Sequence, residues 1–214
     1  MKANRSYIIG LTGGIACGKS NVARTLKAQG CPIIDTDKIS HALTAPNGPA
    51  LPFIRAEFGD SVFADTGELN RAELASVVFS SPDKIAALNA ILHPMIFAEM
   101  ERQMLLFHTE PLLVLEIPLL YETGAEKYCN EVWAVYVQPE EQLRRLMRRN
   151  TLTRVQALGR ITSQMPALEK ARRADAAIDT SGSYAQTAAK VKALWNDLLR
   201  RLDIDQSEYP AREA

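Results

Sequence analysis

The sequence predicts an α/β protein with three layers, in which helices cover both faces of a parallel five-stranded sheet. Apolar runs recur along the chain, and segments with helical patterns separate them. The runs cover residues 7–11, 31–35, 112–117, 131–137 and 176–179. Near-continuous apolar strands separated by helices are typical of parallel sheets that are buried on both faces. Because ligands of such sheets bind beyond the carboxyl ends of the strands, the residues after each run are the first candidates for chemistry.

We expect the 214 residues to form a single domain with two helical additions to its core. The core takes in about residues 6–37, 111–138 and 174–202. Residues 38–110 are predicted to be a helical insert, because they combine helical patterns with turn clusters. Residues 139–173 are predicted to be a second helical segment, which is rich in arginine.

Capping signals place the helices of the insert. Asn70 begins a capping box for a helix over residues 71–79. Ser81 is followed by a proline at the first helical position of the next helix. We expect that helix to bend or break at Pro94, because proline removes a hydrogen bond from the helix interior.

The last helix is predicted over about residues 184–201, where apolar residues recur at spacings of three and four. This pattern is typical of a helix that packs on a core, so Trp195 is interpreted as structural. The tail over residues 203–214 is polar, and we expect it to be frayed.

The composition excludes several classes of protein. Twenty-five basic and 25 acidic residues give a formal net charge of zero, so we expect no nucleic-acid partner and no attraction to membranes. No apolar run approaches the ~18 residues of a membrane span, and no secretory signal is evident. Cys17, Cys31 and Cys129 lack metal or disulfide spacing, which favours the reducing cytoplasm.

Residues 13–20 read Gly-Gly-Ile-Ala-Cys-Gly-Lys-Ser and match G-x-x-x-x-G-K-[ST], the phosphate-binding P-loop. An apolar strand precedes the loop and a helical pattern follows it, stopping at Gly30, which is the order that the motif requires. Lys19 would reach the β- and γ-phosphates of ATP, and the Ser20 hydroxyl would bind Mg²⁺. The candidate ATP-binding residues here are Gly13, Gly14, Ile15, Ala16, Cys17, Gly18, Lys19, Ser20 and Asn21.

Cys17 lies inside this loop and allows two interpretations. It is either a small residue that the loop tolerates or an oxidisable thiol whose pKa is lowered by the start of the helix. We favour the first.

Asp37 follows the second predicted strand in the run Asp35-Thr36-Asp37. A carboxylate in such a strand-to-helix loop can take a proton from an attacking hydroxyl or hold Mg²⁺ through water. The alternative is that Asp37 only caps the following helix. With a P-loop on a nearby strand, we favour the catalytic role.

Residues 139–173 contain a local excess of arginine, although the formal net charge of the whole chain is zero. The cluster comprises Arg144, Arg145, Arg148, Arg149, Arg154, Arg160, Arg172 and Arg173. Exposed arginines are commonly only a solvated face. We nevertheless predict a lid in which one or two of them close over the γ-phosphate and help to exclude water.

Taken in order, these motifs resemble those of the dephospho-coenzyme A kinase family over about residues 7–200. In the first half of the chain, residues 10–20 match G-L-T-G-G-I-G-S-G-K-S, residues 35–40 match D-A-D-x-I-A, and residues 92–94 match L-H-P. In the second half, residues 117–122 match I-P-L-L-x-E, residues 145–150 match R-x-x-x-R-D, and residues 160–164 match R-I-x-x-Q. Residues 169–180 approach the last motif, E-K-x-x-x-A-D-x-x-I-x-N. The P-loop alone is unspecific, whereas the ordered set is specific.

The resemblance implies a P-loop kinase fold and a reaction that completes coenzyme A synthesis. ATP with Mg²⁺ would phosphorylate the ribose 3′-hydroxyl of dephospho-CoA, giving coenzyme A and ADP. Asp37 would be the catalytic base, Lys19 and Ser20 would bind the triphosphate and Mg²⁺, and Arg145 and Arg149 would be phosphate-binding lid residues.

The resemblance also implies where the two substrates bind. Residues 38–110 would shape the acceptor pocket, with His93 near it. Tyr121 and Glu122, after the third strand, would line the same pocket or simply pack their loop. Leu119 and Glu122 are candidate substrate-binding residues. The loop from Thr180 to Ser183, including Gly182, would meet the adenine of ATP.

Four departures from the family pattern bear on the site. Ala16 and Cys17 replace Gly and Ser, and Ala16 matters if its backbone needs a positive φ. Asn150 replaces the lid Asp, which we expect to loosen the lid. Thr180 replaces an Asn beside the adenine.

Other classes remain as alternatives. The nearest is another small-molecule P-loop kinase, such as a nucleoside or shikimate kinase. A small GTPase is disfavoured, because no N-K-x-D motif stands at a suitable place. We expect a monomer or a weak homo-oligomer.

Overall fold

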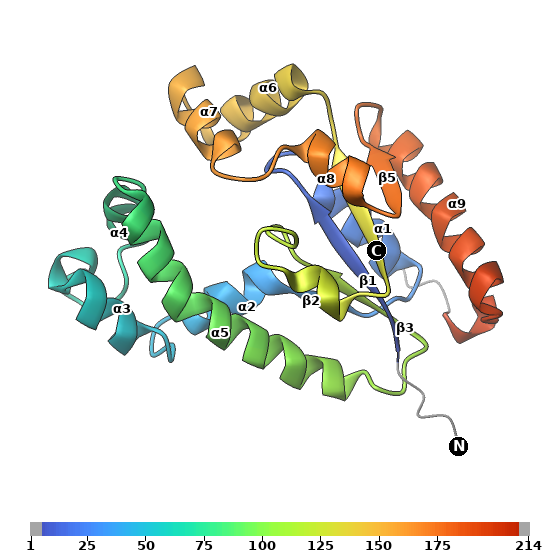
Figure 1. Ribbon diagram of the computed structural model, residues 1–214, viewed down its shortest axis with the longest axis horizontal. Coiled ribbons are helices and arrows are strands. Elements are labelled where there is room, and N and C mark those ends of the chain that lie inside the picture. The colour runs from blue at the N-terminus through green and yellow to red at the C-terminus, as the bar shows by residue number, and fades with distance from the viewer. Residues whose placement is uncertain (1–5, 210–214) are drawn as a thin grey trace. The chain divides into compact units, whose positions relative to one another are not determined.

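The computed structural model describes residues 6–209, which form two compact units (Figure 1). The first unit contains the chain up to Ile34 and from Phe107 onwards, and the second contains Asp35–Leu106. The strands are β1 (Tyr7–Gly13), β2 (Ile33–Asp35), β3 (Leu112–Glu116), β4 (Glu131–Tyr136) and β5 (Ala176–Asp179). The α-helices are α1 (Lys19–Ala28), α2 (Thr36–Leu43), α3 (Leu51–Phe58), α4 (Arg71–Val78), α5 (Pro82–Leu106), α6 (Pro139–Asn150), α7 (Arg154–Thr162), α8 (Ala167–Arg173) and α9 (Tyr184–Leu202). Three short 3-10 helices are η1 (Asp60–Val62), η2 (Ala125–Tyr128) and η3 (Gln206–Glu208).

The five strands lie in one sheet in the order β2-β3-β1-β4-β5, which confirms the predicted fold class. β1 pairs in parallel with β3 and with β4, and β4 pairs in parallel with β5. β1 runs two residues further than predicted, to Gly13. A Cβ atom on Gly13 would lie 2.5 Å from the carbonyl oxygen of Val135, so only glycine lets β1 and β4 stay paired to that point. The central strand therefore delivers the chain directly into the glycine-rich loop.

Helices cover both faces of the sheet in the first unit. α1 and α9 pack on each other, while α8 crosses β1, β4 and β5 on the opposite face (Figure 1). Trp133 of β4 and Trp195 of α9 are both completely buried in the main core. The prediction that Trp195 is structural is confirmed. Burying such large apolar side chains is the main source of stability in the unit.

The second unit is helical, and the break predicted as one possibility for its longest helix does not occur. Asn70 caps α4 by accepting a hydrogen bond from the Glu73 N–H, as the capping pattern predicted. α5, however, does not break at Pro94, because it continues as one helix from Pro82 to Leu106. A proline removes a single backbone hydrogen bond. α5 packs against α2, α3 and α4, and these contacts hold the helix together across that gap.

The start of the tail also differs from the prediction. Tyr209 is only 4% exposed and packs edge-to-face on Trp195, with ring centroids 5.3 Å apart. Its hydroxyl oxygen accepts a hydrogen bond of 2.5 Å from the backbone N–H of Leu112, at the start of β3. One aromatic side chain therefore fastens the segment from Asp203 to Tyr209 to the core. Residues 210–214 of the predicted frayed tail lie outside the described residues.

Tyr209→Phe is expected to destabilise the protein by about 1–3 kcal/mol. The substitution keeps the ring contact but leaves the buried Leu112 N–H without its hydrogen-bond acceptor. Urea unfolding monitored by circular dichroism measures the change, with Tyr184→Phe as the control because Tyr184 is half-exposed. Equal stability of the two variants would contradict the assignment.

Candidate active site

The loop between β1 and α1 forms an anion-binding nest. Gly18 precedes the first residue of α1 with φ +86°, a left-handed conformation that glycine adopts without strain. The first turn of α1 contains no acidic residue. The backbone N–H groups at the helix start and the positive end of the helix dipole are therefore available to a negatively charged group. The geometry confirms the strand–loop–helix order that the motif requires.

Lys19 forms a buried ion pair at this site. Its Nζ lies 2.6 Å from Oε1 of Glu116, and the two side chains are only 12% and 8% exposed. Glu116 is the last residue of β3, the strand beside β1. Glu116 was not among the predicted site residues, although a carboxylate at the end of an otherwise wholly apolar strand is a usable signal.

Two glutamines hold the backbone of Ile15 in the middle of the loop. Nε2 of Gln142, in α6, donates to the Ile15 carbonyl oxygen at 2.9 Å. The Ile15 N–H donates to Oε1 of Gln164, which follows α7, at 3.2 Å. Sequence reasoning quoted Gln164 only within a motif and missed Gln142, because these contacts join positions more than 120 residues apart.

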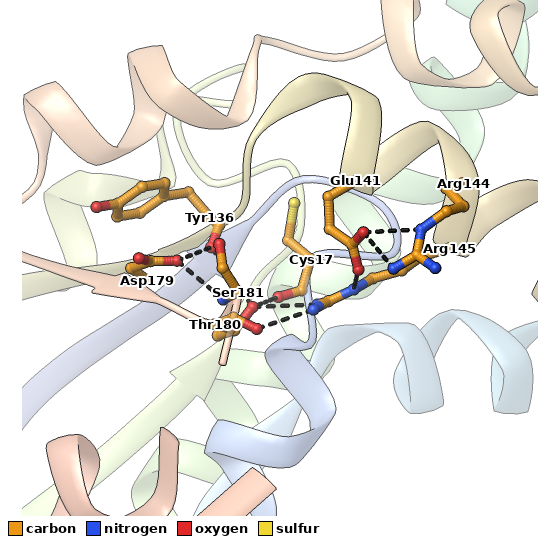
Figure 2. Close-up of polar contacts among 8 residues, drawn as sticks. All are labelled: Cys17, Tyr136, Glu141, Arg144, Arg145, Asp179, Thr180 and Ser181. Atoms are coloured by element: carbon orange, nitrogen blue, oxygen red, sulfur yellow. Dashed lines mark hydrogen bonds and ion pairs between the residues drawn. The ribbon is translucent and has the colours of Figure 1, made fainter. Parts of the chain in front are cut away.

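A chain of contacts from α6 ends on the next part of the loop, as Figure 2 shows. Glu141 accepts a hydrogen bond from Nε of Arg145 at 2.6 Å. The Arg145 Nη2 donates to the backbone carbonyl of Thr180 at 2.9 Å. The Thr180 hydroxyl in turn donates to the carbonyl of Cys17 at 2.6 Å. The residue that replaces the family's Asn thus braces the loop from β5.

Cys17 is not the activated thiol of the second interpretation. Its side chain is completely buried, and burial raises the pKa of the thiol to about 11. The proximity of a helix start would lower that pKa, but removing the thiolate from water has the larger effect here. The first interpretation, a small residue that the loop tolerates, fits the structure.

Thiol labelling tests this directly. Burial also raises the pKa of Cys31, and it raises that of Cys129 to about 12. A pKa of about 11 for Cys17 lowers the thiolate fraction of this residue at neutral pH about 100-fold relative to an ordinary thiol. The native protein is therefore expected to react very slowly with iodoacetamide. The unfolded protein should show three reactive thiols. A fast-reacting native thiol would contradict the burial argument.

The two arginines that were predicted for a lid differ in their surroundings. Arg145 is 24% exposed and is engaged by Glu141 and Thr180. Arg149 is exposed at the end of α6, and its Nε donates to Oδ1 of Asn150 at 2.9 Å. Asn150 therefore keeps a hydrogen bond to Arg149 where the family has Asp, although the bond no longer joins two charges.

Glu122 lies in a network around a buried lysine. The Lys170 side chain is fully buried, and its Nζ lies 2.8 Å from Glu122 and 2.6 Å from the Pro118 carbonyl. Burial lowers the pKa of Lys170. Glu122 also accepts a hydrogen bond from the Met165 N–H at 2.9 Å. These contacts join the loop after β3 to the middle of α8 and to the segment that precedes this helix.

Asp37 lies in the first turn of α2, where its side chain is exposed. The capping alternative is wrong, because Asp35 caps this helix. The Asp35 carboxylate accepts hydrogen bonds from the N–H groups of Asp37 and Lys38.

The remaining predicted site residues lie in separate elements. His93 is partly buried in α5 with its ring near Phe97, and burial lowers its pKa. Leu119 follows β3 and is partly buried. Gly182 lies just before α9, where a Cβ atom would come within 2.5 Å of Oε1 of Gln186.

The described residues contain no group of three or more His, Cys, Asp or Glu side chains able to hold a metal ion. Within residues 6–209, no helix is both long and apolar enough to cross a bilayer.

A parallel sheet whose central strand leads through a glycine nest and a lysine into a helix defines the class of P-loop nucleotide-binding proteins. The comparisons with known proteins agree. The family model described as dephospho-CoA kinase matches residues 7–186. The dephospho-CoA kinase of Symbiobacterium thermophilum is 45% identical over 190 residues, covering 88% of this chain and 80% of that protein. That of Carboxydothermus hydrogenoformans is 41% identical over 197 residues, covering 89% and 96%.

Two solved structures are also similar. One, from Thermus thermophilus, is 35% identical with a TM-score of 0.77, and the alignment covers 91% of this chain and 98% of that chain. The dephospho-CoA kinase from Campylobacter jejuni is 28% identical with a TM-score of 0.67 and the same coverage. The chain belongs to the dephospho-CoA kinase family, whose reaction is the last step of coenzyme A synthesis.

Proposed function

We propose that this protein transfers the γ-phosphoryl group of ATP to the ribose 3′-hydroxyl of dephospho-CoA, giving coenzyme A and ADP. Family membership supports the reaction. The single structural observation that carries it is the loop after β1, in which a glycine nest leads into the buried Lys19–Glu116 pair. The nest offers backbone N–H groups to the phosphates, and Lys19 adds a positive charge.

Lys19 is held ready for the nucleotide. Its ion pair with Glu116 keeps the ammonium group oriented in a site of low exposure. When the β- and γ-phosphates bind, Lys19 would share its three N–H donors between them and Glu116. Electrostatic stabilisation of this kind is strongest where water is excluded.

Mg²⁺ is the proposed metal of the reaction. The exposed Ser20 hydroxyl and the Glu116 carboxylate are oxygen donors of the type that Mg²⁺ prefers, and one or two protein oxygens are enough beside the phosphates. Bound there, the ion would neutralise charge on the β- and γ-phosphates.

We propose different roles for the two lid arginines, Arg145 and Arg149. Arg145 is already bound to Thr180, so we propose that it mainly fixes the edge of the nucleotide site, where Thr180 and Gly182 would meet adenine. Arg149 is exposed on the following turn of α6, and its guanidinium would bind the transferred phosphate.

Asp37 is the proposed base that accepts the proton of the 3′-hydroxyl. Its exposed carboxylate lies in the first turn of α2, two residues after the end of β2, and Asp35 already performs the capping. We propose that dephospho-CoA binds to the helical insert over residues 38–110, near His93, and to Leu119 and Glu122 after β3. The contacts of Glu122 with Lys170 would hold its carboxylate in a fixed orientation.

The deciding experiment incubates the purified protein with MgATP and dephospho-CoA and follows the products by mass spectrometry. We expect ADP and a product heavier by one phosphate on the 3′-oxygen. Parallel reactions with a nucleoside panel and with shikimate test the other P-loop kinases, and binding of GTP against ATP tests the GTPase alternative. Phosphorylation of another acceptor in preference to dephospho-CoA would overturn the proposal.

The cellular setting and assembly state are proposals of the same kind. All three cysteines are free thiols, which supports a reducing cytoplasm. We propose a monomer or weak homo-oligomer, which sedimentation at several concentrations would test.

A further inference from the structure

The phosphate-binding loop holds an alanine in a backbone conformation that favours glycine. Ala16 has φ +60°, in the left-handed region. For an alanine this conformation is disfavoured about 5- to 30-fold, because the Cβ atom approaches a backbone oxygen. Strained residues of this kind persist only where their surroundings over-determine them. The contacts of the neighbouring peptide groups show what holds Ala16.

The conformation of Ala16 is set by the two peptide groups that it joins. The carbonyl of the peptide between Ile15 and Ala16 accepts a hydrogen bond from Nε2 of Gln142. The N–H of the peptide between Ala16 and Cys17 donates to the Gly14 carbonyl at 3.1 Å. With both peptide planes held, φ and ψ of Ala16 have little freedom. The first of the two bonds comes from a side chain that is distant in sequence.

The position of Gln142 is itself fixed. Its residue is 5% exposed, so the amide has little room for another rotamer. A Cβ atom on Gly14 would lie 2.7 Å from Nε2, which shows how closely the amide packs on the loop. Ile15 and Ala16 also pack on the apolar cluster of Leu143, Leu146 and Ala157 in α6 and α7.

We propose that Gln142 is a positioning residue, which holds Ala16 left-handed so that the loop has its phosphate-binding shape before ATP arrives. Gln164 and Thr180 assist by holding the peptide groups on either side. The inference rests on the proposed function only in taking ATP as the ligand of the loop. Preorganisation of this kind increases affinity by removing the cost of ordering the loop on binding.

The simpler alternative is that Gln142 only fastens α6 to the core. The two roles differ in how they depend on residue 16. A glycine adopts positive φ without strain, so a loop with Ala16→Gly needs no clamp to keep its shape. If Gln142 only fastens α6, the effect of replacing Gln142 is the same with alanine or glycine at position 16.

The test is a double-mutant cycle of Gln142→Met and Ala16→Gly, with the Kd for MgATP measured by calorimetry without any acceptor. In the protein with the native Ala16, we expect Gln142→Met to weaken MgATP binding about 5- to 30-fold. This is the factor by which the left-handed conformation is disfavoured for an alanine. In the Ala16→Gly background we expect it to weaken binding less than about threefold, because glycine carries no such strain. Gln206→Met, an exposed glutamine in η3, is the control and should leave Kd unchanged.

Two results would overturn the inference: equal weakening by Gln142→Met in the native and the Ala16→Gly backgrounds, or no weakening beside the native Ala16. Gln142→Asn is run in parallel, because it keeps a buried amide but is one methylene too short to reach Ile15. Either variant decides between the two roles provided that circular dichroism shows it folded. Turnover of dephospho-CoA is measured separately. Coupling in the ATP cycle without such turnover would keep this inference and overturn the proposed function.

Discussion

Asp37→Asn is expected to lower kcat by a factor on the order of 10²–10⁴ while leaving the affinity for ATP nearly unchanged. The amide is almost the same size as the carboxylate but cannot accept the proton of the acceptor hydroxyl. The helix should stay intact, because Asp35 rather than Asp37 caps α2. The loss should therefore fall on kcat, with KM for ATP and the melting temperature close to those of the native protein.

The matched control for this variant is Asp35→Asn, which removes a carboxylate two residues away. Asparagine is as good a helix cap as aspartate, so α2 should form and kcat should change little. Steady-state kinetics with MgATP and dephospho-CoA compare the two variants. If Asp35→Asn abolished turnover and Asp37→Asn did not, the base would have been assigned to the wrong carboxylate.

The strands were predictable because each is apolar almost throughout. Burial on both faces imposes that composition on β3, which the run over residues 112–117 identified. The short run over residues 176–179 identified β5, although this edge strand is only partly buried. The phosphate-binding loop was predictable for a related reason. Its shape requires glycine and lysine at fixed spacing, and those requirements are visible in the sequence itself.

The contacts that brace the loop could not be predicted in the same way. Gln142 and Thr180 reach it from α6 and from the end of β5, and no local pattern relates them to Ile15 or Cys17. The rise in the pKa of Cys17 was missed for a similar reason. Sequence shows the nearby helix start, whereas the burial that outweighs it comes from elements distant in the chain.

The tail shows how little sequence signal an anchor can have. A polar segment with one aromatic residue is typical of a frayed end. Whether Tyr209 finds a pocket depends on Trp195 and on the N–H of Leu112, which only the folded core brings together. The capping of α2 by Asp35 rather than Asp37 could not be predicted either. Aspartate is a good helix cap at both positions, and the sequence does not show which of the two is used.

Lys19→Met is expected to lower kcat/KM for ATP by a factor on the order of 10²–10³, the usual effect of removing one preorganised donor from a developing charge. The variant should also be less stable, because Glu116 loses its ion-pair partner at a site where its side chain is only 8% exposed. Breaking a buried pair from one side costs about 3–5 kcal/mol. A loss of activity alone would therefore not separate binding from folding.

The double variant Lys19→Met with Glu116→Gln makes that separation. Replacing the carboxylate by an amide removes the buried charge, so the double variant should regain much of the stability that Lys19→Met loses. It should not regain activity, because the charge that binds the β- and γ-phosphates is still missing. Thermal unfolding and kinetics of the native protein, of each single variant and of the double variant measure both effects. Recovery of kcat/KM together with stability would show that Lys19 supports the fold rather than the phosphates.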